Sequence, residues 1–124
     1  MILMKKGTGR ILIPICLFFS LVLTSCSWWQ KPLDRTSGFS ALLRKTATAI
    51  QAADWASALA SWEQTQAAWR RIKPYLQIGI DHDYINGLED HLTLLKGHLI
   101  AGEQGDALAL ILLIENTWET MGDL

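Results

Sequence analysis

Residues 81–101 read DHDYINGLEDHLTLLKGHLIA and carry the clearest structural pattern of the chain. Apolar side chains recur in this stretch at steps of three, four, three and four residues: Ile85, Leu88, Leu92, Leu95 and Leu99. Steps of this size place the side chains on one stripe of an α-helix. The stretch therefore predicts an amphipathic helix that begins near Asp81 and packs its apolar stripe against other helices.

Similar patterns predict two helices before this stretch. The first runs from about residue 38 to 52, with Ser37 as its N-cap. The second runs from about residue 55 to 72, with Asp54 as its N-cap. Residues 73–80 contain proline and glycine, so they are expected to interrupt the helices.

One more helix is predicted after a tight turn at Gly102 and Gly105. It starts with Asp106 as N-cap and stops at Gly122. Leucines on nearly every side predict that it is the most buried of the four: Leu108, Leu110, Leu112 and Leu113. The expected fold is all-α, a small antiparallel bundle of about four helices (two helical hairpins) behind an N-terminal signal or anchor segment.

The composition excludes two classes of protein. The chain has 124 residues, of which 50% are hydrophobic and 19% charged, and this balance excludes an intrinsically disordered chain. The formal net charge of −1 excludes a basic nucleic-acid-binding domain. The length allows one domain.

Residues 1–25 have the features of an export signal. Three basic residues stand at the front: Lys5, Lys6 and Arg10. An apolar run follows at residues 11–23, and as a helix it would span only about 20 Å of the roughly 30 Å hydrocarbon core. A signal peptide is therefore favoured over a spanning helix.

The end of the apolar run resembles the lipobox of bacterial lipoproteins, with the residues Leu23, Thr24, Ser25 and Cys26. The resemblance implies cleavage after Ser25 and attachment of fatty-acyl chains, such as palmitate, to Cys26. Several acyl chains anchor a protein firmly, whereas one is marginal. The open alternatives are an uncleaved anchor helix and an ordinary cleaved signal.

Residues 26–36 are expected to be a lipidated tether, followed by the helical domain at residues 37–122. Trp28 and Trp29 directly follow the anchor cysteine, and indole rings favour the level of the lipid headgroups. The two rings are therefore candidate interfacial anchors, although they could also fold back onto the domain. Pro32 disfavours a helix in this segment.

Trp55, Trp62 and Trp69 are spaced by seven residues, so a helix places their rings on one stripe. The stripe is open to two interpretations. It is either a core seam, because Leu59 shares its face, or a binding strip for a small ligand or lipid.

The sequence contains no catalytic motif, so we expect a protein that is not an enzyme, with no cofactor and no metal. A metal site is the weaker alternative to a helix-capping segment, with the candidate ligands Asp81, His82, Asp83, Glu89 and Asp90. The end of the second helix carries a basic cluster of Arg70, Arg71 and Lys73. Cations there suit the helix dipole, and the alternative is a contact to a phosphate or a lipid headgroup.

The region from Asp54 to Met121 carries a set of short motifs at fixed places along its helices. They are Asp54-Trp55, Trp69, Asp81-His82-Asp83-Tyr84-Ile85, Leu88, Leu92, Leu95-Lys96-Gly97 and Gly105-Asp106-Ala107-Leu108. With these motifs the region resembles domain-of-unknown-function family 4363, which comprises small exported helical proteins of Gram-positive bacteria. Asn86 stands where that family usually has an acid. The resemblance implies an exported helical protein and adds no catalytic residue.

Together these patterns predict a lipoprotein anchored on the extracytoplasmic side of the cell membrane. Its expected role is that of a non-enzymatic helical interaction module. The expected partners are the membrane itself and another envelope or integral membrane protein, with no nucleic acid. The alternative is a lipoprotein that binds a small ligand or lipid on the Trp55–Trp62–Trp69 stripe.

Overall fold

The computed structural model describes residues 30–123, and within them it contains five helices and no strand. The helices are α2 (Gln30–Ser37), α3 (Phe39–Gln51), α4 (Trp55–Leu76), α5 (His82–Ala101) and α6 (Gln104–Gly122). The signal segment, the lipobox, Cys26 and the tryptophans at 28 and 29 lie outside the described residues. None of the helices within residues 30–123 combines the length and the hydropathy that a membrane span requires.

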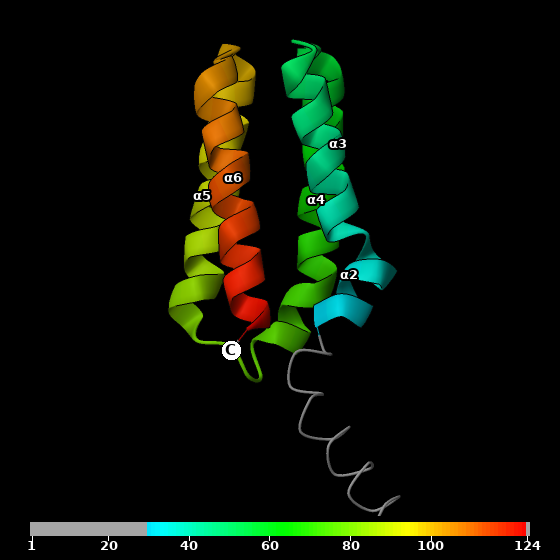
Figure 1. The fold of residues 1–124 in the computed structure, drawn as a ribbon, viewed down its shortest axis with the longest axis vertical. Helices are drawn as coiled ribbons and strands as arrows, with labels where there is room; N and C mark the ends of the chain where they lie inside the picture. The colour runs from blue at the N-terminus through cyan, green and yellow to red at the C-terminus, as the bar shows by residue number, and fades with distance from the viewer. Residues whose placement is uncertain (1–29, 124) are drawn as a thin grey trace, which may run out of the picture.

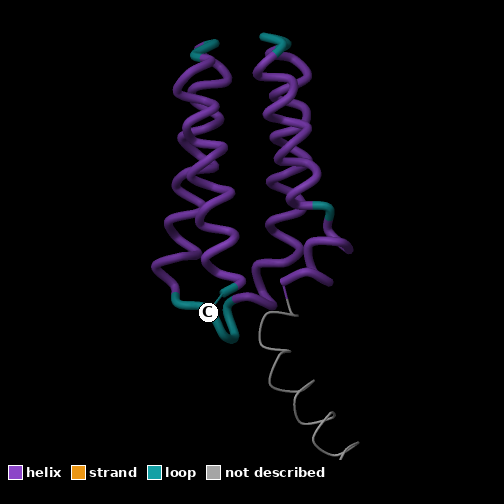
Figure 2. The backbone as a smooth tube through the Cα atoms, in the orientation of Figure 1, coloured by secondary structure: helices purple, strands orange, loops and turns teal. Residues whose placement is uncertain are grey.

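Two helical hairpins lie side by side and form the predicted bundle (Figure 1). Helix α3 packs mainly on α4, and α5 mainly on α6. The hairpins meet through the pairs α3·α6 and α4·α5, so each long helix has two neighbours. The connections between the four long helices are short turns at the two ends of the bundle, whereas the turn between α2 and α3 lies on its side (Figure 2). The all-α prediction is confirmed.

Helix α2 was not expected, because Pro32 was predicted to prevent a helix in the tether. Pro32 is the third residue of α2, and the first four N–H groups of a helix have no partner within the helix. The missing N–H of proline therefore removes no hydrogen bond there. The last part of the expected tether is thus a helix that packs on α4 and α3.

The N-terminus of α3 is capped by α2 rather than by Ser37 alone. The N-cap position is Gly38, with a φ of 70° that favours glycine. The Asp34 carboxylate accepts a hydrogen bond from the Ser40 N–H at 2.8 Å, and Ser37 Oγ accepts one from the Phe39 N–H at 3.3 Å. Helix α2 is therefore fixed to the start of α3 by polar contacts.

Two other predicted caps are confirmed. Asp54 accepts a hydrogen bond from the Ser57 N–H at the start of α4. Asp81 accepts one from the Asp83 N–H at the start of α5. Both aspartates therefore begin a helix where the sequence places them.

Three predicted boundaries are wrong. Helix α4 continues to Leu76, past Pro74, because Leu76 is buried in the core and holds the last turn in place. Helix α6 begins at Gln104, so Asp106 lies inside its first turn instead of capping it. At its other end α6 includes Gly122 and is followed by Asp123 as C-cap.

The leucines of α6 predicted a helix buried on nearly all sides, but one side of α6 is exposed. Leu112 is 66% exposed and Leu113 is 47% exposed. A helix in a bundle of this size has neighbours on one side only, so the apolar residues on its outer side remain open to solvent.

Replacing Trp69 should be the most damaging single change in the bundle. Its indole is fully buried, whereas Trp55 on the same stripe is half-buried. Trp69→Ala is expected to lower the free energy of unfolding by about 3–5 kcal/mol, through lost burial and a cavity. Trp55→Ala is the matched control and should cost clearly less. Urea unfolding followed by far-ultraviolet circular dichroism measures both, and equal losses would contradict the assignment.

Candidate functional site

The tryptophan stripe lies mostly inside the bundle. Trp62 and Trp69 are 6% and 0% exposed, and only Trp55 is partly open. The Trp62 indole N–H donates to the Leu92 carbonyl at 2.8 Å, which ties α4 to α5. Two of the three rings are therefore core groups with satisfied polar atoms, so the stripe does not form an open surface for a ligand.

The indole N–H of Trp69 is satisfied by a carboxylate. It donates to Glu89 Oε1 at 3.0 Å, and the same oxygen accepts from Lys73 Nζ at 2.6 Å. Partial burial raises the pKa of Glu89. The hydrogen bonds from Lys73 and Trp69 and the positive charge of Lys73 lower it, and together they outweigh the effect of burial. The net pKa of Glu89 lies below its ordinary value of 4.5, so the carboxylate is ionised at neutral pH.

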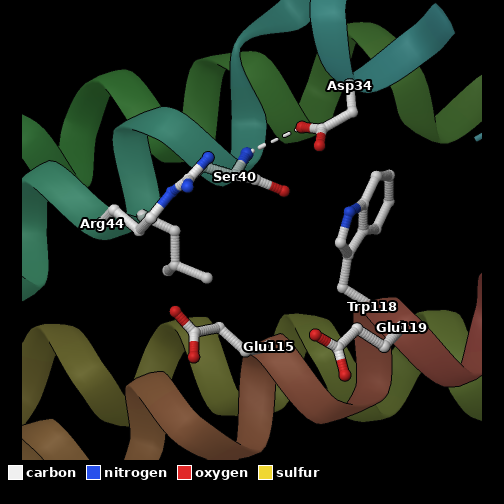
Figure 3. A pocket seen from close by; sticks show the side chains of 7 residues that line it. Asp34, Ser40, Arg44, Glu115, Trp118 and Glu119 are labelled. Carbon is white, nitrogen blue, oxygen red and sulfur yellow. Dashed lines mark hydrogen bonds between the residues drawn. The ribbon is translucent and has the colours of Figure 1, made fainter. Parts of the chain in front are cut away.

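A cavity of about 380 Å³ opens between α2, α3 and α6. Figure 3 shows Arg44 and Ser40 on α3 facing Glu115, Trp118 and Glu119 on α6. Its complete lining is Asp34, Ser40, Leu43, Arg44, Glu115, Trp118 and Glu119.

The walls of this cavity combine apolar and acidic groups. Trp118 and Leu43 are buried and offer apolar surface, with the Trp118 side chain 6% exposed. Among residues 30–123, neither Glu115 nor Glu119 takes part in an ion pair within 4.0 Å. Three carboxylates face one guanidinium, that of Arg44, so the lining carries a formal excess of negative charge. This chemistry suits a small organic cation.

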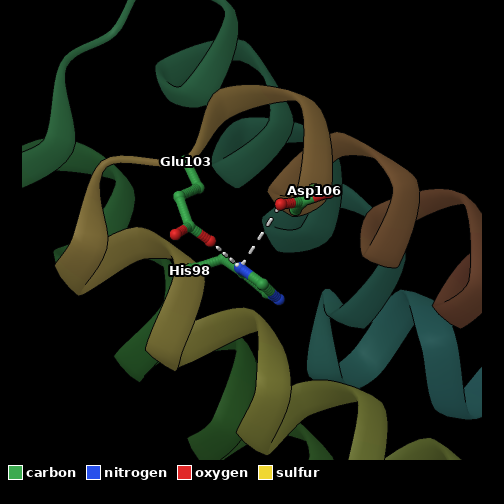
Figure 4. A group of neighbouring side chains, drawn as sticks. All are labelled: His98, Glu103 and Asp106. Carbon is green, nitrogen blue, oxygen red and sulfur yellow. Dashed lines mark hydrogen bonds and ion pairs between the residues drawn. The ribbon is translucent and has the colours of Figure 1, made fainter.

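A second polar cluster closes the turn between α5 and α6 (Figure 4). The His98 ring nitrogen Nδ1 contacts the Glu103 carboxylate directly, and Asp106 Oδ2 lies 4.0 Å from it. His98 is in the last turn of α5, where the helix dipole favours a cation. The three groups lie within 4.8 Å of one another, as in a metal site, but they also serve as partners for each other.

The structure does not assemble the metal site considered at His82. In residues 30–123, the one set of three potential ligands that come together is His98, Glu103 and Asp106. Asp81 instead caps α5, and Glu89 turns toward α4. The sequence analysis missed the His98 cluster, although His98 and Glu103 flank the predicted turn at Gly102.

The basic cluster at the end of α4 is divided. Lys73 pairs with Glu89, whereas Arg70 and Arg71 are exposed. Within the described part of the chain, neither arginine makes an ion pair to a carboxylate. Two guanidinium groups therefore remain available near one end of the bundle.

Comparisons with protein-family models, curated proteins and solved structures gave no match. The resemblance to domain-of-unknown-function family 4363 stays a prediction, as do the signal peptide, the lipobox and the interfacial role of Trp28 and Trp29.

The Glu89 pair should make the stability of the bundle sensitive to acid. The stabilisation is present above about pH 4.5 and is lost as the pH falls through the lowered pKa, because protonated Glu89 no longer attracts Lys73. Glu89→Gln should cost about 0.5–1 kcal/mol at pH 7 and flatten the loss below pH 4.5. Thermal unfolding from pH 3 to 7 measures this. Glu63→Gln, at an exposed pair with Lys96, is the control, and an unchanged acid profile in Glu89→Gln would contradict the prediction.

Proposed function

We propose that this protein is a lipoprotein anchored on the extracytoplasmic side of the cell membrane, with the bundle as a non-enzymatic interaction module. The observation that carries the proposal is the run Leu23-Thr24-Ser25-Cys26 directly after a basic front and an apolar segment. Cys16 and Cys26 are the two cysteines of the chain, and removal of residues 1–25 leaves Cys26 alone. A single exposed thiol is a liability in an oxidising compartment, whereas a lipidated one is not.

The outer side of the α5–α6 hairpin is the best candidate for the interaction surface. Leu94 on α5 is 54% exposed, and Leu112 and Leu113 on α6 are 66% and 47% exposed. Counted from the turn at 102–103, Leu94 and Leu112 are almost equally distant, so the antiparallel helices place them at the same level. A partner from the envelope or an integral membrane protein would cover these side chains.

A second candidate function is the binding of a small organic cation in the cavity between α2, α3 and α6. The specific observation is a buried indole beside three carboxylates and one guanidinium in about 380 Å³. Ligand sites in proteins commonly fall in this range of volume. We prefer this cavity to the tryptophan stripe as the candidate ligand site, because Trp62 and Trp69 are buried.

Lipidation is tested by intact mass and membrane partitioning of the protein made in a bacterial host, beside Cys26→Ala. The wild type should lose residues 1–25, gain the mass of acyl chains and stay with the membrane. The variant should lack the added lipid mass. Retention of residues 1–25 in both proteins would overturn the proposal, because the front would then be an uncleaved anchor helix.

Cation binding in the cavity is tested with 1,4-diaminobutane by calorimetric titration. Glu115→Gln and Glu119→Gln should each weaken binding by about 0.5–1 kcal/mol, a few-fold in Kd, because each removes one partly solvated carboxylate. The effect should shrink in high salt. Asp90→Asn, an exposed acid on α5, serves as the control. Equal affinity in all variants would rule out the cavity as the site.

A further inference from the structure

One end of the bundle exposes two large apolar side chains. Tyr75, in the last turn of α4, is 65% exposed, and Ile78, in the turn that follows, is 87% exposed. Within residues 30–123, Ile78 is the most exposed large apolar residue. We call residues 75–78 the apolar tip. Exposing such a side chain in water is unfavourable unless another apolar phase is at hand.

The apolar tip lies at the same end of the bundle as α2 (Figure 1). Helix α2 begins at Gln30, four residues after Cys26. Four residues of chain reach at most about 14 Å even when fully extended. An acyl chain on Cys26 therefore holds this end, and not the opposite one, within about 14 Å of the membrane surface.

The charges around the apolar tip are nearly balanced. Arg70 and Arg71 lie one to two turns before it on α4, and Asp81 and Asp83 follow it at the start of α5. Attraction to anionic lipid is therefore weak, and burial of the apolar side chains must carry the contact. Tyrosine suits this place, since its ring is apolar and its hydroxyl can stay at the headgroup level.

We propose that the apolar tip docks on the phospholipid bilayer, with Ile78 and Tyr75 in the interfacial layer and Arg70 and Arg71 toward lipid phosphates. The proposal rests on the lipid anchor at Cys26. Because the anchor fixes the protein at the surface, docking is an intramolecular step with a high effective concentration, and two side chains suffice. The bundle then stands on the membrane in one orientation.

The experiment uses the full chain reconstituted in vesicles that contain lipids brominated at the upper acyl carbons. An environment-sensitive fluorescent residue replaces Ile78 in one protein and Ile100 in the other. Ile100 is the matched control, because it is 68% exposed and lies at the opposite end of α5. Bromine should quench the probe at position 78 at least several-fold more than the probe at position 100. With the probe moved to Tyr75, Ile78→Asp should reduce its quenching.

The intact mass of the protein in the same preparations shows whether Cys26 carries lipid. This measurement separates the docking proposal from the lipoprotein proposal. Lipidated protein with equally weak quenching at positions 78 and 100 overturns docking and leaves the anchor standing. Emission at position 78 that is blue-shifted without quenching, and that reverts on dilution, also overturns docking, because a second copy then covers the tip. Protein that retains residues 1–25 without added lipid overturns the proposed anchor itself.

Discussion

The burial of the Trp69 indole is the interaction on which the rest of the bundle depends. From α4 this ring reaches the other three long helices. Its centroid lies 5.9 Å from that of Phe39 on α3 and 6.5 Å from that of Trp118 on α6. Its N–H must be satisfied in the core, and Glu89 of α5 accepts it. The Trp69 side chain thus contacts all three of the other long helices. Its acceptor, Glu89, also pairs with Lys73 at the interface of α4 and α5.

The same aromatic cluster shapes the cavity. Trp118 packs against Phe39 with 4.8 Å between ring centroids, and it also lines the space between α2, α3 and α6. The apolar wall of the cavity is therefore a part of the core that cannot move independently. The acidic wall is supplied by Asp34 of α2 and by Glu115 and Glu119 of α6. In the proposed cation site, the apolar wall would restrict the size of the ligand and the carboxylates would select for its positive charge.

The sequence predicted what depends on local chemistry, and it missed what depends on contacts between distant segments. Helical periodicity located the four long helices, and the caps Asp54 and Asp81 were correct because side-chain capping is a local interaction. The predicted end of α4 near residue 72 was wrong, because the burial of Leu76 outweighs the helix-breaking effect of Pro74. The cavity was not predictable, because its lining comes from α2, α3 and α6, and the existence of α2 was itself unexpected.

The proposed orientation of the bundle would limit which partners can reach the leucines of the α5–α6 hairpin. Leu94 lies twelve residues after the start of α5, about 18 Å along the helix from the end that carries α2. If that end rests on the bilayer, Leu94 and Leu112 stand well above the headgroups. A partner embedded in the membrane could meet them only with a segment that rises by a similar height. In the proposed orientation, a partner that covers these leucines would therefore need an extramembrane domain, whether or not it also spans the bilayer.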